Sequence, residues 1–140
     1  MNVKEELKSY IYSQRDEAIK LLQKLVQQPS VRGNEGKTQA VVVEKCRQLG
    51  LEIDLWDLDE DPELRLHDCF HCDRPSASFR GNPNMVALLK GSGGGKSIIL
   101  NGHIDVVPEG NEADWHVSPY SGLVENDRIY GRGTTDMKGG

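Results

Sequence analysis

The residues best suited to chemistry lie in two short segments of the chain. The first, residues 101–108, reads NGHIDVVP and follows a short apolar run. In extended chain, residues two apart point to the same side, so His103 and Asp105 face one space. An imidazole that binds a metal ion through one nitrogen commonly donates its other N–H to a carboxylate or a carbonyl, which fixes the tautomer. The spacing therefore suits a metal ligand with its support, and it also suits a surface pair that caps a loop.

The second segment, residues 130–140, reads YGRGTTDMKGG and places four glycines around Asp136. Glycine-rich backbone turns tightly or approaches another group closely, and such geometry is common at functional sites. Taken alone, the segment is explained equally well by a plain glycine-rich turn.

Two other patterns suggest binding sites and are weaker. Residues 95–97, GKS, match the end of a phosphate-binding loop, but Lys90 replaces the first glycine of that pattern and a strand-like run follows in place of a helix. The run His67–Cys72 reads HDCFHC and has C-x-x-C spacing, yet no second pair of zinc ligands accompanies it. We therefore expect a hairpin turn at the first and a loop at the second, with a small zinc site as the alternative for His67–Cys72.

Apolar spacing predicts the elements that must position these residues. A three- to four-residue period predicts one helix from Lys4 to about Gln28, ended by Pro29, and another from Thr38 to Leu49 that ends at Gly50. Alternation predicts a strand over 51–56 with one buried face, formed by Leu51, Ile53 and Leu55. Two hairpins are expected, one joining 85–89 to 97–100 and one joining 123–124 to 128–130.

The stretch 59–83 shows neither period and contains three prolines, so it is interpreted as a loop or insertion. Helices followed by strands without regular alternation indicate an α/β fold built on a mixed sheet. A chain of 140 residues is long enough for one such domain.

Composition and charge exclude several function classes. The chain has 17 Lys+Arg against 22 Asp+Glu, a formal net charge of −5, so nucleic acid is not an expected partner. Its apolar runs fall far short of the roughly 20 residues that span a bilayer, and its N-terminus lacks the apolar core of a secretory signal. Its 3 cysteines, an odd number, favour reduced thiols. These features together predict a cytoplasmic protein.

Taken together, the two segments resemble the paired signatures of the di-zinc aminoacylase and carboxypeptidase family, which includes acetylornithine deacetylase and succinyl-diaminopimelate desuccinylase. The matching motifs are Gly-His-x-Asp-Val-Val-Pro and Gly-Arg-Gly-x-x-Asp-Met-Lys-Gly-Gly. The resemblance implies a zinc-peptidase-like mixed sheet with flanking helices. Residues 1–140 would then be the N-terminal part of the catalytic domain, without the lid domain that the family inserts into it.

The same resemblance implies a role for each matching residue. His103 would be a ligand of one zinc ion, Asp136 would bridge two Zn²⁺ (possibly Co²⁺) ions, and Asp105 would be the catalytic-site aspartate that supports His103. The peptide bond between Asp136 and Met137 would be cis. The family's Glu-Glu pair, whose first member is the general base, and its remaining metal ligands would lie beyond Gly140. The whole enzyme would be a homodimer.

The expected function is metal-dependent hydrolysis of the amide bond of an N-acyl amino acid or small peptide, most closely like acetylornithine deacetylase. Two metal ions can lower the pKa of a shared water and polarise the amide carbonyl. Because part of the site is missing from residues 1–140, we expect this chain alone to bind zinc weakly and to be inactive. The alternative from another class is a non-catalytic zinc-binding or interaction module that uses His67–Cys72 and the acidic stretch Glu52–Asp68.

Overall fold

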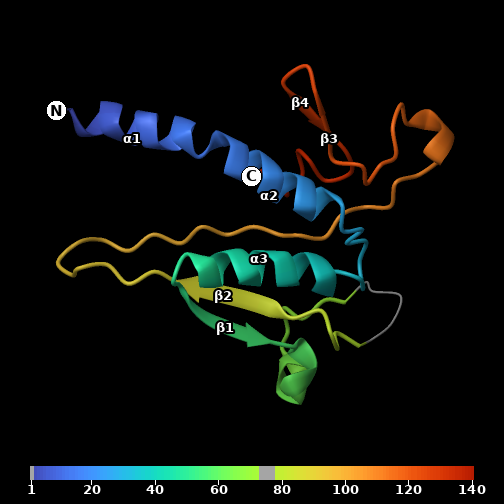
Figure 1. The fold of residues 1–140 in the computed structure, drawn as a ribbon. Coiled ribbons are helices and arrows are strands. Elements are labelled where there is room, and N and C mark those ends of the chain that lie inside the picture. The colour runs from blue at the N-terminus through green and yellow to red at the C-terminus, as the bar shows by residue number, and fades with distance from the viewer. Residues whose placement is uncertain (1, 73–77) are drawn as a thin grey trace.

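Three helices form the N-terminal part of the chain in the computed structural model, which describes residues 2–72 and 78–140 (Figure 1). They are α1 (Val3–Ser13), α2 (Arg15–Val26) and α3 (Gly36–Gln48). The prediction of one unbroken helix from Lys4 to Gln28 is wrong, because the helix is interrupted at Gln14, where φ is −91° and ψ is 0°. The Gln14 N–H is shared between the carbonyls of Tyr10 and Ile11, and the apolar pattern lapses over 13–17. Two helices in line replace the single one.

The α3 helix packs on a two-stranded antiparallel sheet of β1 (Glu52–Trp56) and β2 (Asn84–Leu88) (Figure 1). Gly50 has φ +74° and ends the helix as predicted. The strand predicted over 51–56 is present, but its expected buried face is not closed, because Leu55 is 43% exposed. The α/β class predicted from the sequence is confirmed, with two small antiparallel sheets in place of one continuous sheet.

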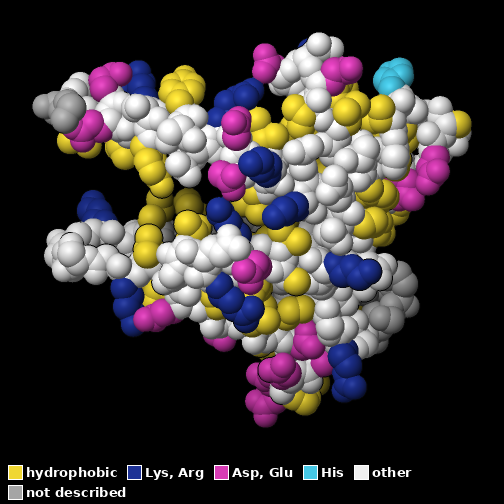
Figure 2. Space-filling model, in the orientation of Figure 1, with side chains coloured by type: hydrophobic (Ala, Val, Ile, Leu, Met, Phe, Trp, Pro, Cys, Tyr) yellow, Lys and Arg dark blue, Asp and Glu magenta, His cyan; other side chains and the backbone are white. Residues whose placement is uncertain are grey.

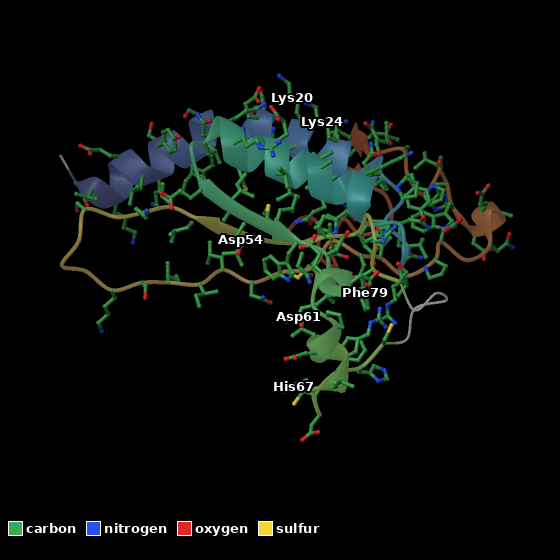
Figure 3. All side chains as sticks on the ribbon, turned by 90° about the horizontal axis from the view of Figure 1, so that it is seen from below. Lys20, Lys24, Asp54, Asp61, His67 and Phe79 are labelled. Atoms are coloured by element: carbon green, nitrogen blue, oxygen red, sulfur yellow. The ribbon has the colours of Figure 1, made fainter. Side chains whose placement is uncertain are left out.

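The two predicted hairpins have opposite outcomes. The second is confirmed as β3 (Leu123–Glu125) paired with β4 (Arg128–Tyr130), and Asn126 and Asp127 both have the positive φ that a two-residue turn of this kind requires. The first is wrong, because β2 pairs with β1 and residues 97–100 belong to no strand in the described chain. A flexible turn of five residues, 91–95, does not fix the register of its arms. Figures 1 and 3 show the chain beyond this turn returning well apart from β2.

The buried interior is small and lies where α2, α3 and the later loops meet. Its apolar members are Leu25, Val26, Val43, Phe79 and Val106. By contrast, Ile98, Ile99 and Leu100 are each more than 80% exposed. Figure 2 shows further hydrophobic side chains gathered beneath α1. Among residues 2–72 and 78–140, no helix combines the length and the apolar character needed to cross a membrane.

Residues 58–66 form two short 3₁₀ helices, η1 (Leu58–Glu60) and η2 (Pro62–Leu66). The rest of the predicted loop contains no α-helix or strand over 67–72 and 78–83, and residues 73–77 of this prediction lie outside the described residues. Figure 2 shows acidic side chains gathered at this end of the molecule.

Candidate metal and catalytic site

Buried backbone contacts fix the segment that carries His103 and Asp105. Val106 forms an isolated parallel bridge with Val31, and its N–H donates to the Ser30 carbonyl at 2.9 Å. The Ser30 hydroxyl donates to the Ile104 carbonyl at 2.6 Å. Ser30 is fully buried and Val106 is 3% exposed, so water does not compete for these bonds. The loop after α2 therefore holds residues 104–106 in place.

The glycine-rich segment packs directly on this strand-like stretch. Gly133 has φ +85°, and a Cβ atom there would lie 2.5 Å from Val106 Cγ1. Only glycine combines that backbone conformation with so close an approach. Its carbonyl accepts from the Lys138 N–H at 2.9 Å, which closes the turn that carries Asp136. The peptide bond between Asp136 and Met137 is cis, as the family resemblance implies.

Lys138 ties this turn to the end of α2. Its ammonium donates to the carbonyls of Leu25 at 2.9 Å and Gln28 at 2.8 Å. These carbonyls lie at and just beyond the end of the helix, where backbone acceptors lack intrahelical partners. The side chain is buried, and burial lowers the pKa of Lys138 to about 8.

The three residues singled out in the sequence come together in space. His103 Nδ1 lies 3.0 Å from Asp105 Oδ1, and His103 Nε2 lies 3.1 Å from Asp136 Oδ1. All three line one cavity of about 390 Å³. The Asp136 side chain is 85% exposed and that of His103 is about half exposed, so both can reach a ligand from solvent. Each ring nitrogen of the imidazole thus lies close to one carboxylate, and Nδ1 also lies 3.2 Å from the main-chain carbonyl of Asp105.

Comparison with known proteins finds a family match over the C-terminal part of the chain. Residues 99–140, which contain both motifs, match the model of peptidase family M20/M25/M40. The chain is 32% identical over 145 residues to the N-formyl-4-amino-5-aminomethyl-2-methylpyrimidine deformylase of Halalkalibacterium halodurans, an alignment that covers 100% of this chain and 29% of the relative. Residues 99–140 are therefore similar to the M20 peptidase family. The resemblance predicted from the two motifs is confirmed.

Two further relatives carry a different name. The succinyl-diaminopimelate desuccinylase of Coxiella burnetii is 28% identical over 124 residues, covering 89% of this chain and 27% of the relative. That of Vesicomyosocius okutanii is 58% identical over 41 residues, covering 29% of this chain and 11% of the relative. The chain therefore spans less than a third of the length of each of these relatives.

The donor set of the cavity fits part of a zinc site. A neutral imidazole nitrogen and a carboxylate oxygen are ordinary zinc ligands. His103 Nε2 and Asp136 Oδ1 face each other, and the main-chain carbonyl and the carboxylate of Asp105 both lie beside the other ring nitrogen, where a supporting acceptor belongs. In the part of the chain that the structure describes, no three His, Cys, Asp or Glu side chains converge as a metal site. These residues thus offer two ligands, and any others would come from outside them.

Two arginines on the wall of this cavity were not found from the sequence. Arg32 lies in a loop that was recognised only by its composition, and Arg132 lies inside the glycine-rich motif. Arg32 Nε lies 3.5 Å from Asp105 Oδ2. No spacing rule connects positions 32 and 105, so only the fold brings the two charges together.

Arg132 is held by a cluster beside the cavity. Its guanidinium lies 5.1 Å from the ring centroid of Trp115, and the Trp115 indole N–H donates to the Glu109 carbonyl at 3.0 Å. The Tyr120 hydroxyl donates to Glu109 Oε2 at 2.8 Å. Burial and this bond raise the pKa of Tyr120 to about 12. The pKa of Glu109 is held below its usual value by a hydrogen bond from the Glu109 backbone and by the one from Tyr120. The two aromatic residues pack this cluster and do not line the cavity.

The alternative zinc site at His67–Cys72 has no converging ligands among the described residues. His67 lies just after η2, and its Nδ1 accepts from the Cys69 N–H at 3.1 Å (Figure 3). This region is organised instead around Asp59, whose carboxylate accepts from Arg65 at 2.6 Å and from the Ser78 hydroxyl at 2.7 Å. Those two bonds hold the pKa of Asp59 at about 2.

Proposed function

We propose that the protein is a metal-dependent amidohydrolase that removes a small acyl group from an amine nitrogen. His103 and Asp136 bind zinc, and Asp105 positions His103. The observation that carries the proposal is the arrangement of the imidazole, with Nε2 3.1 Å from Asp136 and Nδ1 3.0 Å from Asp105. A single side chain is therefore presented to the cavity through one nitrogen and secured through the other.

The residues of this chain have separate tasks in that reaction. Asp105 receives the Nδ1–H of His103 between its main-chain carbonyl, 3.2 Å away, and its carboxylate Oδ1, 3.0 Å away, which leaves the Nε2 lone pair directed into the cavity. Asp136 is mostly exposed and has two carboxylate oxygens, so it suits a ligand shared by two ions. When bound, zinc supplies an acidified water and polarises the amide carbonyl.

The general base lies outside this set. Among residues 2–72 and 78–140, the carboxylates that line the cavity are those of Asp105 and Asp136, and both contact His103. We therefore place the base, together with the remaining ligands, in the Glu-Glu pair that the family resemblance implies beyond Gly140. We also propose that the whole enzyme is a homodimer in the cytoplasm.

The substrate is proposed at the level of a small N-acyl compound. The names of the relatives denote removal of a formyl group and of a succinyl group. Neither name is that of an acetylornithine deacetylase, so the acetyl substrate is one member of the proposed class and not its definition.

Metal content tests the proposal against the alternative module. The protein made from the complete reading frame that encodes this chain is loaded with zinc, freed of excess metal, and measured by mass spectrometry. The proposal predicts that His103→Ala loses zinc and that Cys69→Ala keeps all of it. The opposite result favours the module built on His67–Cys72.

Activity gives a second, independent measurement. The same protein is offered N-formyl, N-acetyl and N-succinyl amines before and after treatment with a chelator. Turnover of at least one that is lost on chelation and restored by Zn²⁺ or Co²⁺ supports the proposal, and chelator-resistant turnover refutes it. Residues 1–140 expressed alone should bind zinc weakly and show no turnover.

A further inference from the structure

Besides His103, Asp105 contacts a charged residue, Arg32, that has no task in the proposed reaction. Its Oδ1 lies 3.0 Å from His103 Nδ1, and its Oδ2 lies 3.5 Å from Arg32 Nε. The two oxygens of one carboxylate thus contact two different cations or hydrogen-bond donors. Arg32 lines the same cavity as His103 and Asp136.

The backbone around Arg32 fixes it opposite Asp105. Val31, its preceding neighbour, forms the parallel bridge with Val106, and Ser30 bonds to both Ile104 and Val106. Gly33, its following neighbour, has φ +94° and donates its N–H to Glu35 Oε2 at 3.0 Å, which turns the chain away. Arg32 is therefore the residue of this loop that the paired backbones set beside Asp105.

We propose that Arg32 is a positioning residue for the metal ligand His103 and that it acts through Asp105. This inference rests on the proposed function. A carboxylate with a partner at each oxygen rotates less freely, so Oδ1 stays beside His103 Nδ1 and, together with the Asp105 main-chain carbonyl 3.2 Å from Nδ1, holds that edge of the ring. The ring is thereby held so that Nε2 stays directed at Asp136 and the proposed metal position. Groups that bond a metal ligand directly typically change metal affinity by about 10–100-fold, so Arg32, one contact further out, is expected at the lower end of that range.

Because Arg32 is positively charged, the direction in which its removal changes zinc affinity distinguishes two explanations of its role. A guanidinium near a cation site repels the cation, so a residue that acted only by its charge would weaken metal binding. A residue that positions Asp105 strengthens metal binding despite that repulsion. Removal of Arg32 therefore has opposite consequences under the two explanations.

Zinc affinity of the protein made from the complete reading frame is the test, measured by competition with a chromogenic chelator. Arg32→Ala is expected to bind Zn²⁺ about tenfold more weakly. Arg32→Lys, which keeps the charge and a donor, is expected to restore most of the affinity. If Arg32→Ala does not fold, Arg32→Gln removes the ion pair with a smaller change in shape and should show the same loss. Arg47→Ala, which removes an exposed arginine from α3, is the matched control and should leave zinc affinity unchanged.

A double-mutant cycle with Asp105→Asn identifies the route. If Arg32 acts through Asp105, Arg32→Ala has no further effect on zinc affinity in the Asp105→Asn background. In the zinc-loaded wild type, the Nδ1–H proton of His103 should give a slowly exchanging NMR signal, which Arg32→Ala should lose and Arg32→Lys should keep.

Unchanged or tighter zinc binding in Arg32→Ala overturns the inference, as does an equal loss in Arg47→Ala or an additive loss in the double variant. These results leave the proposed function standing. A wild-type protein that binds no zinc refutes the proposed function itself, and the inference with it.

Discussion

The contact between Gly133 and Val106 is the most direct test of how the two motifs are joined. Gly133→Ala introduces two separate costs. A non-glycine residue at φ +85° costs about 1–2 kcal/mol, and an added methyl group whose carbon lies 2.5 Å from Val106 Cγ1 costs about a further 1–3 kcal/mol through overpacking. The expected loss in the free energy of unfolding is therefore about 2–5 kcal/mol.

Gly93→Ala is a matched control for the first cost alone. Gly93 has φ +91°, and an added Cβ there meets no atom within 4 Å. Its expected loss is at most about 1–2 kcal/mol, because the exposed turn can also relax. The difference between the two variants measures the close approach itself.

Urea unfolding of the protein made from the complete reading frame, followed by tryptophan fluorescence, gives both free energies. Val106→Ala combined with Gly133→Ala should recover part of the loss, because the double variant removes the crowded methyl group. Equal losses for Gly133→Ala and Gly93→Ala would refute the reasoning, and so would a double variant whose losses simply add.

Three further outcomes follow from the pKa shifts. The pKa of Lys138 falls from 10.5 to about 8 on folding, so the unfolded chain binds more protons than the folded chain between these two pH values. The free energy of unfolding therefore rises with pH across this range. A Lys138→Met variant should lack this rise when urea unfolding is measured at pH 7–10. The pKa of Asp59 falls from 3.8 to about 2, so its contribution is full above pH 3.8 and is lost as pH falls toward 2; Asp59→Asn should flatten the stability profile in that window. Tyr120→Phe removes the hydroxyl that donates to Glu109, so the pKa of the Glu109 carboxyl should rise in an NMR titration, whereas an unchanged value would contradict the role given to that bond.

Local patterns predicted those parts of the fold and site that local geometry decides. The two-residue period of extended chain is enough to place His103 beside Asp105, and the Asn126-Asp127 turn is enough to form the β3–β4 hairpin. The predictions failed where a segment distant in the sequence determines which strand is paired. Residues 97–100 have the composition of a strand, yet β2 pairs with β1, which lies on the other side of the loop containing 59–83.

Arg32 shows why part of the site could not be found from the sequence. Its approach to Asp105 depends on backbone bonds between residues 30–31 and 104–106, and backbone donors and acceptors are the same for nearly every residue type. No side-chain pattern therefore records that pairing. The composition of residues 30–36 indicated a loop and nothing about its neighbour.

Val106 is where the three parts of the candidate site meet, and its contacts explain how two loop segments hold His103, Asp105 and Asp136 together. Its backbone is tied to Ser30 and Val31, which sets Arg32 beside Asp105. Its side chain contacts Gly133, which sets the turn that carries Asp136. Because one small buried residue fixes both neighbours, a shift of either segment is transmitted to the imidazole that lies between the two carboxylates. The closeness of His103 to Asp136 is therefore a property of the packing around Val106 as much as of the motifs themselves.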